Sequence, residues 1–363
     1  MSETLPPLFS ALNIGANLSA LGTKARPVAC GDVFHRIIGA TFCSDYRKQL
    51  AAYFERKGQY GVACQGGVES MARSVSLSFA KGYTILSFNG KNAFNLIYRH
   101  EFLPDLATVV PVVSCYVANL YARDPPKLLF AMDNGTTAVI DSARGVQQGY
   151  NLSASIFCYV DVINILLPPA KAQDAEVIKT VATWVQKEQE AMGIKLNRAK
   201  SQVLLAGGIS AATLPVKQRW ILEETDLSVA EGSMRILGVP VGTEEYQRGF
   251  LGAFMRGEPA KLLRELASME DAQASFQILR LSTAIRTAFI LRTVPPDITK
   301  APMEEFDRMP EWSLATVIAS PGAGAPLLGK YAITQARLSI REGGYGLTSS
   351  SDILDTAFIG SQA

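Results

Sequence analysis

The sequence predicts an α+β protein in which a mixed region of strands and helices reaches to about Gly242 and a mostly helical region follows. Three observations predict this fold class. Short β-rich segments bounded by glycine or proline recur before Gly242. Apolar residues at helical spacing recur between those segments. Beyond Gly242, helical patterns occupy residues 250–268, 272–293 and 303–319, with turn-rich breaks at 295–296 and 320–326.

The first elements are a hairpin and a set of helices. Residues 12–28 contain short extended pieces, which favour a hairpin. Asp32 is predicted to be an N-cap, and apolar residues at helical spacing then predict one or two helices to about Arg56. A further helix is expected after Gly67, with Gly82 as its stop.

The middle of the chain alternates between strands and helices. Residues 83–88 predict a buried strand that ends in a tight turn at Asn89-Gly90 and is followed by a helix over 91–103. The remaining expected elements are a helix over 108–122, a hairpin of 127–132 with 136–140, an apolar strand over 159–167, a helix from 178 to Gly193, and strands over 201–206 and 234–241.

Composition bounds the class of protein. With 363 residues, 48% hydrophobic and 19% charged, the chain is a globular protein large enough for two or three subdomains. Its net charge of +2 is below that of a strongly basic autonomous nucleic-acid binder, although local clusters can still serve that purpose.

Five scattered cysteines without a Cys-x-x-Cys pair favour a reducing compartment, so we expect an intracellular location, in the nucleus or the cytoplasm. Residues 1–7 do not resemble a secretory signal, and no apolar run approaches the ~20 residues of a membrane span, so no membrane partner is expected.

A loop with two glutamines between two glycines is the most distinctive stretch. Gly145 and Gly149 permit positive φ and a close approach of neighbouring backbone. Gln147 and Gln148 can each make several hydrogen bonds. Taken alone, the loop is equally well interpreted as a polar turn between two elements.

Eight segments, taken in order, resemble the successive motifs of the reverse transcriptase domain of a non-LTR (LINE-type) retrotransposon, in a degenerate copy. They span most of the chain, from about Leu12 to Thr348. The segments are Arg26-Pro27-Val28-Ala29-Cys30-Gly31 with Arg36, Gln59-Tyr60-Gly61-Val62 with Gly66-Gly67, Asn89-Gly90-Lys91-Asn92-Ala93-Phe94-Asn95, residues 145–153, Tyr159-Val160-Asp161-Val162, residues 193–201, Leu237-Gly238-Val239-Pro240 and residues 340–347.

The resemblance implies a right-hand architecture. Residues 1–82 would form the fingers, 83–242 the palm with an inserted fingers segment at about 104–144, and 243–363 a helical thumb and connection region. In the family, a long helix separates the second and third palm motifs. Only residues 154–158 lie between Ser153 and Tyr159 here, so the palm is expected to be truncated.

The resemblance also implies nucleotidyl transfer with two Mg²⁺ or Mn²⁺ ions, which three aspartates of the family hold. This sequence has Asn89 at the first of these positions and Val162 at the third, so Asp161 is the one carboxylate that remains. An amide is neutral and a valine has no ligand atom. Activity is therefore expected to be impaired.

Further residues of the family pattern imply contacts with an RNA/DNA template-primer and with deoxynucleotides. Phe94 holds the place of the aromatic residue that excludes the ribose 2′-hydroxyl, and Gln147, Gln148 and Gly149 form the loop beside the nascent base pair. Lys200 resembles a lysine near the triphosphate, and Arg26 and Arg36 resemble phosphate-binding residues of the fingers. Each of these charges also fits a solvated surface.

Three interpretations follow from the sequence. The chain is a polymerase domain with residual activity, a catalytically silent remnant that binds nucleic acid, or an α/β protein unrelated to polymerases. The third is favoured if the strand ending at Phe88 and the strand carrying Asp161 are not neighbours. The oligomeric state is left open by the sequence.

Overall fold

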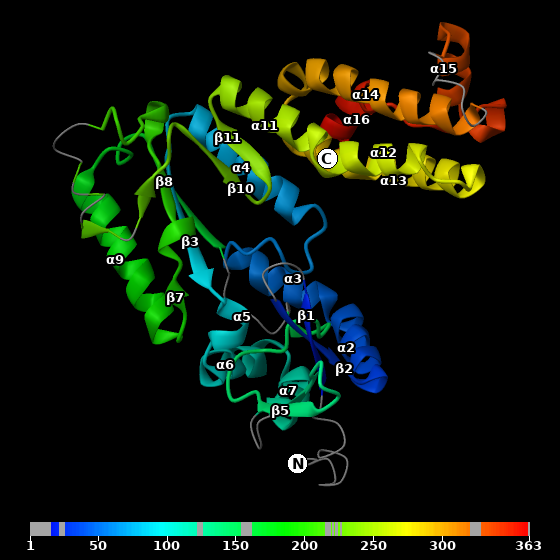
Figure 1. Ribbon diagram of the computed structural model, residues 1–363. Coiled ribbons are helices and arrows are strands. Elements are labelled where there is room, and N and C mark those ends of the chain that lie inside the picture. The colour runs from blue at the N-terminus through cyan, green and yellow to red at the C-terminus, as the bar shows by residue number, and fades with distance from the viewer. Residues whose placement is uncertain are drawn as a thin grey trace. The chain divides into compact units, whose positions relative to one another are not determined.

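The structure, a computed structural model, describes residues 16–21, 26–121, 126–153, 162–214, 219, 221, 224–225, 227–319 and 328–361 (Figure 1). The chain divides into two compact units. The first comprises Met1–Gly67, Thr84–Val203 and Ala212–Val229, and the second comprises Val68–Tyr83, Leu204–Ala211 and Ala230–Ala363. The predicted α+β class is confirmed, and the division into fingers, palm and thumb stays a prediction.

One sheet of the first unit has four strands in the order β2-β1-β4-β5. These strands are β1 (Ala16–Leu21), β2 (Arg26–Gly31), β4 (Lys127–Ala131) and β5 (Thr137–Asp141). Both predicted hairpins, β1 with β2 and β4 with β5, are antiparallel. A parallel pairing of β1 with β4 joins the two hairpins, which are distant in sequence.

The second sheet has β3 at its centre, in the order β6-β3-β8-β9, with β7 also paired to β3. The strands are β3 (Thr84–Lys91), β6 (Val162–Leu167), β7 (Lys195–Leu196), β8 (Gln202–Leu204) and β9 (Ser228–Val229). Residues 84–88 of β3 are all buried, which explains why this stretch is continuously apolar or small instead of alternating.

The first unit also contains helices. They are α2 (Val33–Asp45), α3 (Arg47–Arg56), α5 (Ala93–Leu96), α6 (Arg99–Val109), α7 (Pro111–Tyr121), α9 (Ala175–Ala191) and the short η1 (Arg198–Lys200). Asp32 caps α2 as predicted, because its carboxylate accepts the Phe34 N–H at 2.8 Å.

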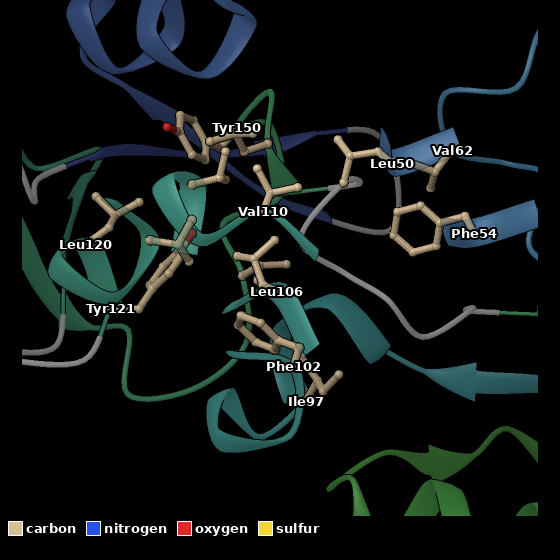
Figure 2. Close-up of a cluster of buried hydrophobic side chains, with 14 of the residues drawn as sticks. Leu50, Phe54, Val62, Ile97, Phe102, Leu106, Val110, Leu120, Tyr121 and Tyr150 are labelled. Atoms are coloured by element: carbon tan, nitrogen blue, oxygen red, sulfur yellow. The ribbon is translucent and has the colours of Figure 1, made fainter. Parts of the chain in front are cut away.

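The core of the first unit joins α3, α6 and α7 to the loop with two glutamines. Figure 2 shows Phe102, Leu106 and Val110 between Tyr121 on one side and Phe54 on the other. Val146, Tyr150 and Leu152 of the loop belong to the same buried cluster. The loop is therefore anchored by hydrophobic burial as well as by hydrogen bonds.

The second unit combines a two-stranded hairpin with a helical bundle. Its elements are α4 (Gly67–Ala80), η2 (Ala206–Gly208), β10 (Ser233–Ile236), β11 (Val239–Gly242), α11 (Glu244–Arg256), α12 (Glu258–Ala267), α13 (Ala272–Thr293), α14 (Pro296–Ile318), α15 (Lys330–Arg337), η4 (Ile340–Glu342) and α16 (Ser350–Gly360). The expected C-terminal helices are present, and α4 lies beside the β10–β11 hairpin (Figure 1).

Three local predictions were wrong. The stretch 234–241 is a hairpin instead of one strand, since Leu237 and Gly238 both take positive φ, 51° and 93°. No turn interrupts β3 at Asn89-Gly90, because Gly90 and Lys91 continue the strand by pairing with β7. The helix expected over 91–103 is divided into α5 and α6, since Ile97 takes an extended conformation after α5.

None of the helices formed by the described residues has the length and apolar composition of a membrane span. Among the same residues, Cys30, Cys43, Cys64 and Cys115 form no disulfide.

A buried carboxylate in the second unit fixes the start of α16. Asp307 of α14 is 4% exposed and accepts the Ser349 and Ser351 hydroxyls, both at 2.7 Å, and the Ser350 and Ser351 N–H groups, both at 2.9 Å. It thereby satisfies donors that the first turn of a helix leaves without partners.

Asp307→Ala is expected to lower the free energy of unfolding by about 3 kcal/mol, because several buried donors lose their acceptor at once. Urea denaturation of the full chain measures this loss. Asp307→Asn should lose less, since its amide keeps one acceptor oxygen. Glu304→Ala, at an exposed position of α14, is the control and should change little. Equal losses for Asp307→Ala and Glu304→Ala would contradict the assignment.

Candidate functional site

Three segments that are distant in sequence meet at the end of β3. Asn89 is paired directly with Val162 in the antiparallel ladder of β3 and β6. Residues directly opposite each other in such a ladder project to the same face, with Cβ atoms about 4.5–5.5 Å apart. The first and third motif segments are therefore neighbours, as the reverse transcriptase interpretation requires and as the unrelated α/β interpretation does not.

The fourth motif segment closes on the other side of β3. The Asn197 N–H donates to the Asn89 carbonyl at 2.7 Å, and the Asn89 N–H donates to the Ser201 hydroxyl at 3.0 Å. Gly90 and Lys91 pair with Leu196 and Lys195. Lys200, predicted to lie near a triphosphate, is an exposed residue of η1 in this same segment.

The side chains that the structure describes at this point do not fit a Mg²⁺ site. The ion prefers carboxylate oxygen, and the paired positions supply one neutral amide and one aliphatic side chain. No group of three or more His, Cys, Asp or Glu residues suited to a metal exists among the described residues. Asp161 lies outside the described residues, as do residues 154–158, where the missing palm helix was inferred.

Both glycines of the loop are required by its geometry. Gly145 has φ +73°, and a Cβ there would lie 2.5 Å from backbone atoms of Phe94 and Asn95. Gly149 has φ +110°, and a Cβ there would lie 2.9 Å from the Ala29 carbonyl oxygen. The predicted positive φ and close approach are confirmed at both positions, and each is a conformation or contact that disfavours a side chain.

The loop spans from α5 to β2. The Val146 N–H donates to the Phe94 carbonyl at 2.7 Å, and the Gln148 carbonyl accepts the Ala29 N–H at 2.7 Å. The segment resembling the second palm motif is therefore bonded to the segments resembling the first palm motif and the first fingers motif. This arrangement joins three of the eight motifs through backbone contacts.

A cavity of about 340 Å³ lies where these segments meet. Gln147 and Gln148 line it together with Asn92 and Asn95, which follow β3 in the chain, and with Ala29 of β2. Gln147 is buried and Gln148 is half-buried. Amide side chains from two segments therefore converge on one hollow, which offers several hydrogen-bond donors and acceptors.

A buried tyrosine, Tyr121, is hydrogen-bonded to the loop with two glutamines. The Tyr121 hydroxyl accepts the Gln147 N–H at 3.1 Å, and the Ser153 hydroxyl donates to the Gln147 carbonyl at 2.5 Å. Burial raises the pKa of Tyr121 to about 12. Tyr150, at the far end of the loop, is hydrogen-bonded to the Tyr116 hydroxyl at 3.1 Å, and burial also raises its pKa.

Arg99 is a positioning residue that the sequence did not predict. Its guanidinium donates to the carbonyls of Ser142 at 2.6 Å, Gly145 at 3.0 Å and Tyr121 at 3.3 Å, and it lies 4.6 Å from the centroid of the Tyr121 ring. Burial lowers its pKa. An arginine directly after Tyr98 belongs to no local pattern, so nothing in the sequence could identify it.

The other predicted site residues are placed less centrally. Phe94 is half-buried in α5 and packs against the core of the first unit. Arg36 is exposed on α2, where its carbonyl accepts the Asn151 side-chain amide at 3.0 Å. Arg26 begins β2, but its side chain lies outside the described part of the structure.

Comparison with known proteins finds similarity only among solved structures. No family model and no curated protein matches the sequence. The chain is similar to telomerase from Candida albicans in complex with the TWJ fragment of telomeric RNA, with a TM-score of 0.38 and 10% identity over 97% of this chain and 65% of that one.

Two telomerase structures from Candida tropicalis are also similar. The apo structure has a TM-score of 0.45 and 9% identity over 95% of this chain and 69% of that one. The complex with the TWJ fragment has a TM-score of 0.39 and 12% identity over 95% and 64%. This chain therefore spans about two thirds of the length of these telomerase chains.

Removing the guanidinium of Arg99 is expected to loosen the loop. Arg99→Ala should lower the free energy of unfolding by about 2–4 kcal/mol, because several buried carbonyls lose a charged donor. It should also speed proteolysis within residues 142–149. Arg99→Lys should restore only part of the protection, because an ammonium cannot span the same carbonyls. Arg47→Ala, an exposed change on α3, is the control, and a proteolysis rate for Arg99→Ala equal to that of Arg47→Ala would exclude this role.

The buried Tyr121 hydroxyl predicts a loss of stability at high pH. Its folded-state pKa of about 12 lies above the value of about 10 for a free tyrosine, so folding favours the neutral form. This contribution, about 3 kcal/mol, is complete below pH ~10 and is lost as pH rises through ~12. Urea midpoints from pH 8 to 12 should fall more steeply for the wild type than for Tyr121→Phe. Tyr331→Phe, at a residue 91% exposed, should follow the wild type.

Proposed function

We propose that this chain is a reverse transcriptase-like, nucleic-acid-binding domain derived from a non-LTR retrotransposon, with strongly reduced capacity for nucleotidyl transfer. The telomerase similarities concern the fold alone, so the proposal rests on the residues of this chain. Its template-primer partner, its intracellular location and any use of Mg²⁺ or Mn²⁺ are parts of the same proposal.

The pairing of Asn89 with Val162 is the observation that carries the proposal. If the motifs belong to one reverse transcriptase-like domain, the first, third and fourth palm segments must be neighbours in space at the end of one strand. β6 and β7 both pair with the end of β3, and the Asn197 N–H donates to the Asn89 carbonyl. An unrelated sequence with similar short motifs has no reason to satisfy that demand.

The loop with two glutamines supports binding of nucleic acid. Gln147 and Gln148 line the same cavity as Asn92 and Asn95, whose side chains are hydrogen-bonded to each other at 2.6 Å, and these residues would meet a base edge or sugar there. In this proposal Gly149 allows the loop backbone to lie close to β2, and Phe94 contacts the sugar. Lys200, Arg26 and Arg36 are assigned to phosphate contacts, which carry affinity and not sequence preference.

Reduced catalysis follows from the chemistry of the paired positions. Nucleotidyl transfer depends on preorganised charge that stabilises the phosphoryl transition state. Asn89 is neutral and Val162 has no donor atom, so Asp161 is the one remaining carboxylate of the family's three. A scaffold with this composition retains the surface that receives a template-primer but lacks most of the charge needed for the reaction.

A primer-extension assay tests the catalytic part. An RNA template with a DNA primer, deoxynucleotides and either Mg²⁺ or Mn²⁺ should give no more incorporation with the wild type than with Asp161→Ala. Incorporation clearly above that of Asp161→Ala would show that the domain is an active polymerase, so the claim of reduced catalysis would be wrong while the family assignment stands.

A binding assay tests the nucleic-acid part separately. Fluorescence anisotropy should detect binding of the same template-primer at low salt, weakening as salt is raised. Gln147→Ala with Gln148→Ala should weaken it about tenfold, corresponding to the loss of one or two hydrogen bonds. Gln49→Ala, an exposed glutamine on α3, is the matched control. Undetectable binding by the wild type would refute the proposed function.

A further inference from the structure

A second cavity lies wholly within the second unit and is independent of the site above. Its volume is about 780 Å³, which is within the usual range for small-molecule sites. Residues of α4, α11, β11, α16 and the junction of α13 with α14 line it. It is larger than the cavity beside the loop with two glutamines.

The wall of this cavity is largely apolar. Leu77 of α4, Ile298 of α14 and Phe358 of α16 are among the residues that line it. Leu77 remains 61% exposed, so this large aliphatic side chain is left uncovered by its own chain. Covering it with an apolar group would be favourable.

Among the described residues that line the cavity, Arg73 is the one that carries a positive charge. Arg73 of α4 donates to the Ser361 hydroxyl at 2.7 Å and to the Ser70 hydroxyl at 3.5 Å, and it has no ion pair with any described carboxylate. The nearest acid in sequence, Glu69, is paired with Arg292 at 3.2 Å. A guanidinium with hydroxyl partners alone can still accept a carboxylate in a bidentate arrangement.

A glutamine in the same wall leaves an acceptor without a partner. The Gln247 Nε2–H group of α11 donates to the Gly242 carbonyl at 3.1 Å. The Gln247 Oε1 is buried and has no hydrogen-bond partner among the described residues. A ligand with an N–H group could supply the missing donor after a small rotation of the amide.

We propose that this cavity binds a small amphipathic carboxylate that carries an N–H donor, such as an N-acyl amino acid. The carboxylate pairs with Arg73, the apolar body covers Leu77, Ile298 and Phe358, and the N–H donates to Gln247. A single cation among the described residues of the lining matches one negative charge. A nucleoside triphosphate, with several negative charges, would leave most of its charge uncompensated.

The test uses undecanoic acid with a terminal dansylamino group, a fluorescent probe whose carboxylate and apolar chain match the proposed contacts with Arg73 and with the apolar wall. Its fluorescence should rise saturably with one site on the wild-type full chain. Arg73→Gln should weaken binding about tenfold, and Leu77→Asp should weaken it by at least as much. Arg286→Gln, an exposed arginine on α13 outside the cavity, should bind as the wild type does.

Chemical specificity is tested by changing the probe and by competition. The methyl ester of the probe should bind wild type and Arg73→Gln equally, because it lacks the charge that Arg73 recognises. An unlabelled N-acyl amino acid should displace the probe, and dATP should not. Circular dichroism establishes whether each variant is folded. If Arg73→Gln does not fold, Leu77→Asp provides the test of binding in this cavity.

Three results would overturn the proposal. The first is no saturable binding by the wild type. The second is equal affinity of the probe for wild type, Leu77→Asp and, where it folds, Arg73→Gln. The third is displacement by dATP in preference to the N-acyl amino acid, which would make this a nucleotide site.

Discussion

The candidate site depends on the two-sided pairing of β3 at residues 89–91. Val162 is paired with Asn89 on one side, and Leu196 and Lys195 are paired with Gly90 and Lys91 on the other. Backbone hydrogen bonds on both sides fix three segments of the chain at one strand end. Asn92, in the left-handed region at φ 54°, then turns the chain into α5, whose carbonyls receive the loop with two glutamines. The position of that loop is thus set by the register of the sheet.

The sequence was most informative where one residue type meets a strict local demand. Local sequence predicts positive φ and close backbone contact at Gly145 and Gly149, and a helix cap at Asp32, and the structure confirms each of these predictions. The sequence was least informative where the conformation of a residue depends on a partner that is distant in sequence. The strand continues through Gly90 because β7 lies there, and Leu237 takes positive φ because β10 and β11 pair across it. Arg99 and Tyr121 act through tertiary contacts that have no sequence pattern.

The proposed function implies that this chain keeps its scaffold and has lost part of its catalytic chemistry. Glycines, caps and apolar residues that hold the segments together are present, whereas two of the three positions that would carry charge are Asn89 and Val162. Hydrophobic burial and backbone pairing tolerate such replacements, because neither depends on the lost carboxylates. Catalysis does not tolerate them, since the charge itself supplies the stabilisation. Under the proposed function, the domain keeps a nucleic-acid-binding fold and has lost most of the charge of its reaction centre.

The most direct test of this account is Mn²⁺ binding, measured by electron paramagnetic resonance, to Asn89→Asp/Val162→Asp. Because the two positions are paired neighbours on one face, the double variant should bind Mn²⁺ at least about tenfold more tightly than the wild type. Asn134→Asp/Val139→Asp makes the same changes in charge on the β4–β5 hairpin and should gain no comparable site. Equal Mn²⁺ affinity in the wild type and in Asn89→Asp/Val162→Asp would contradict the central claim.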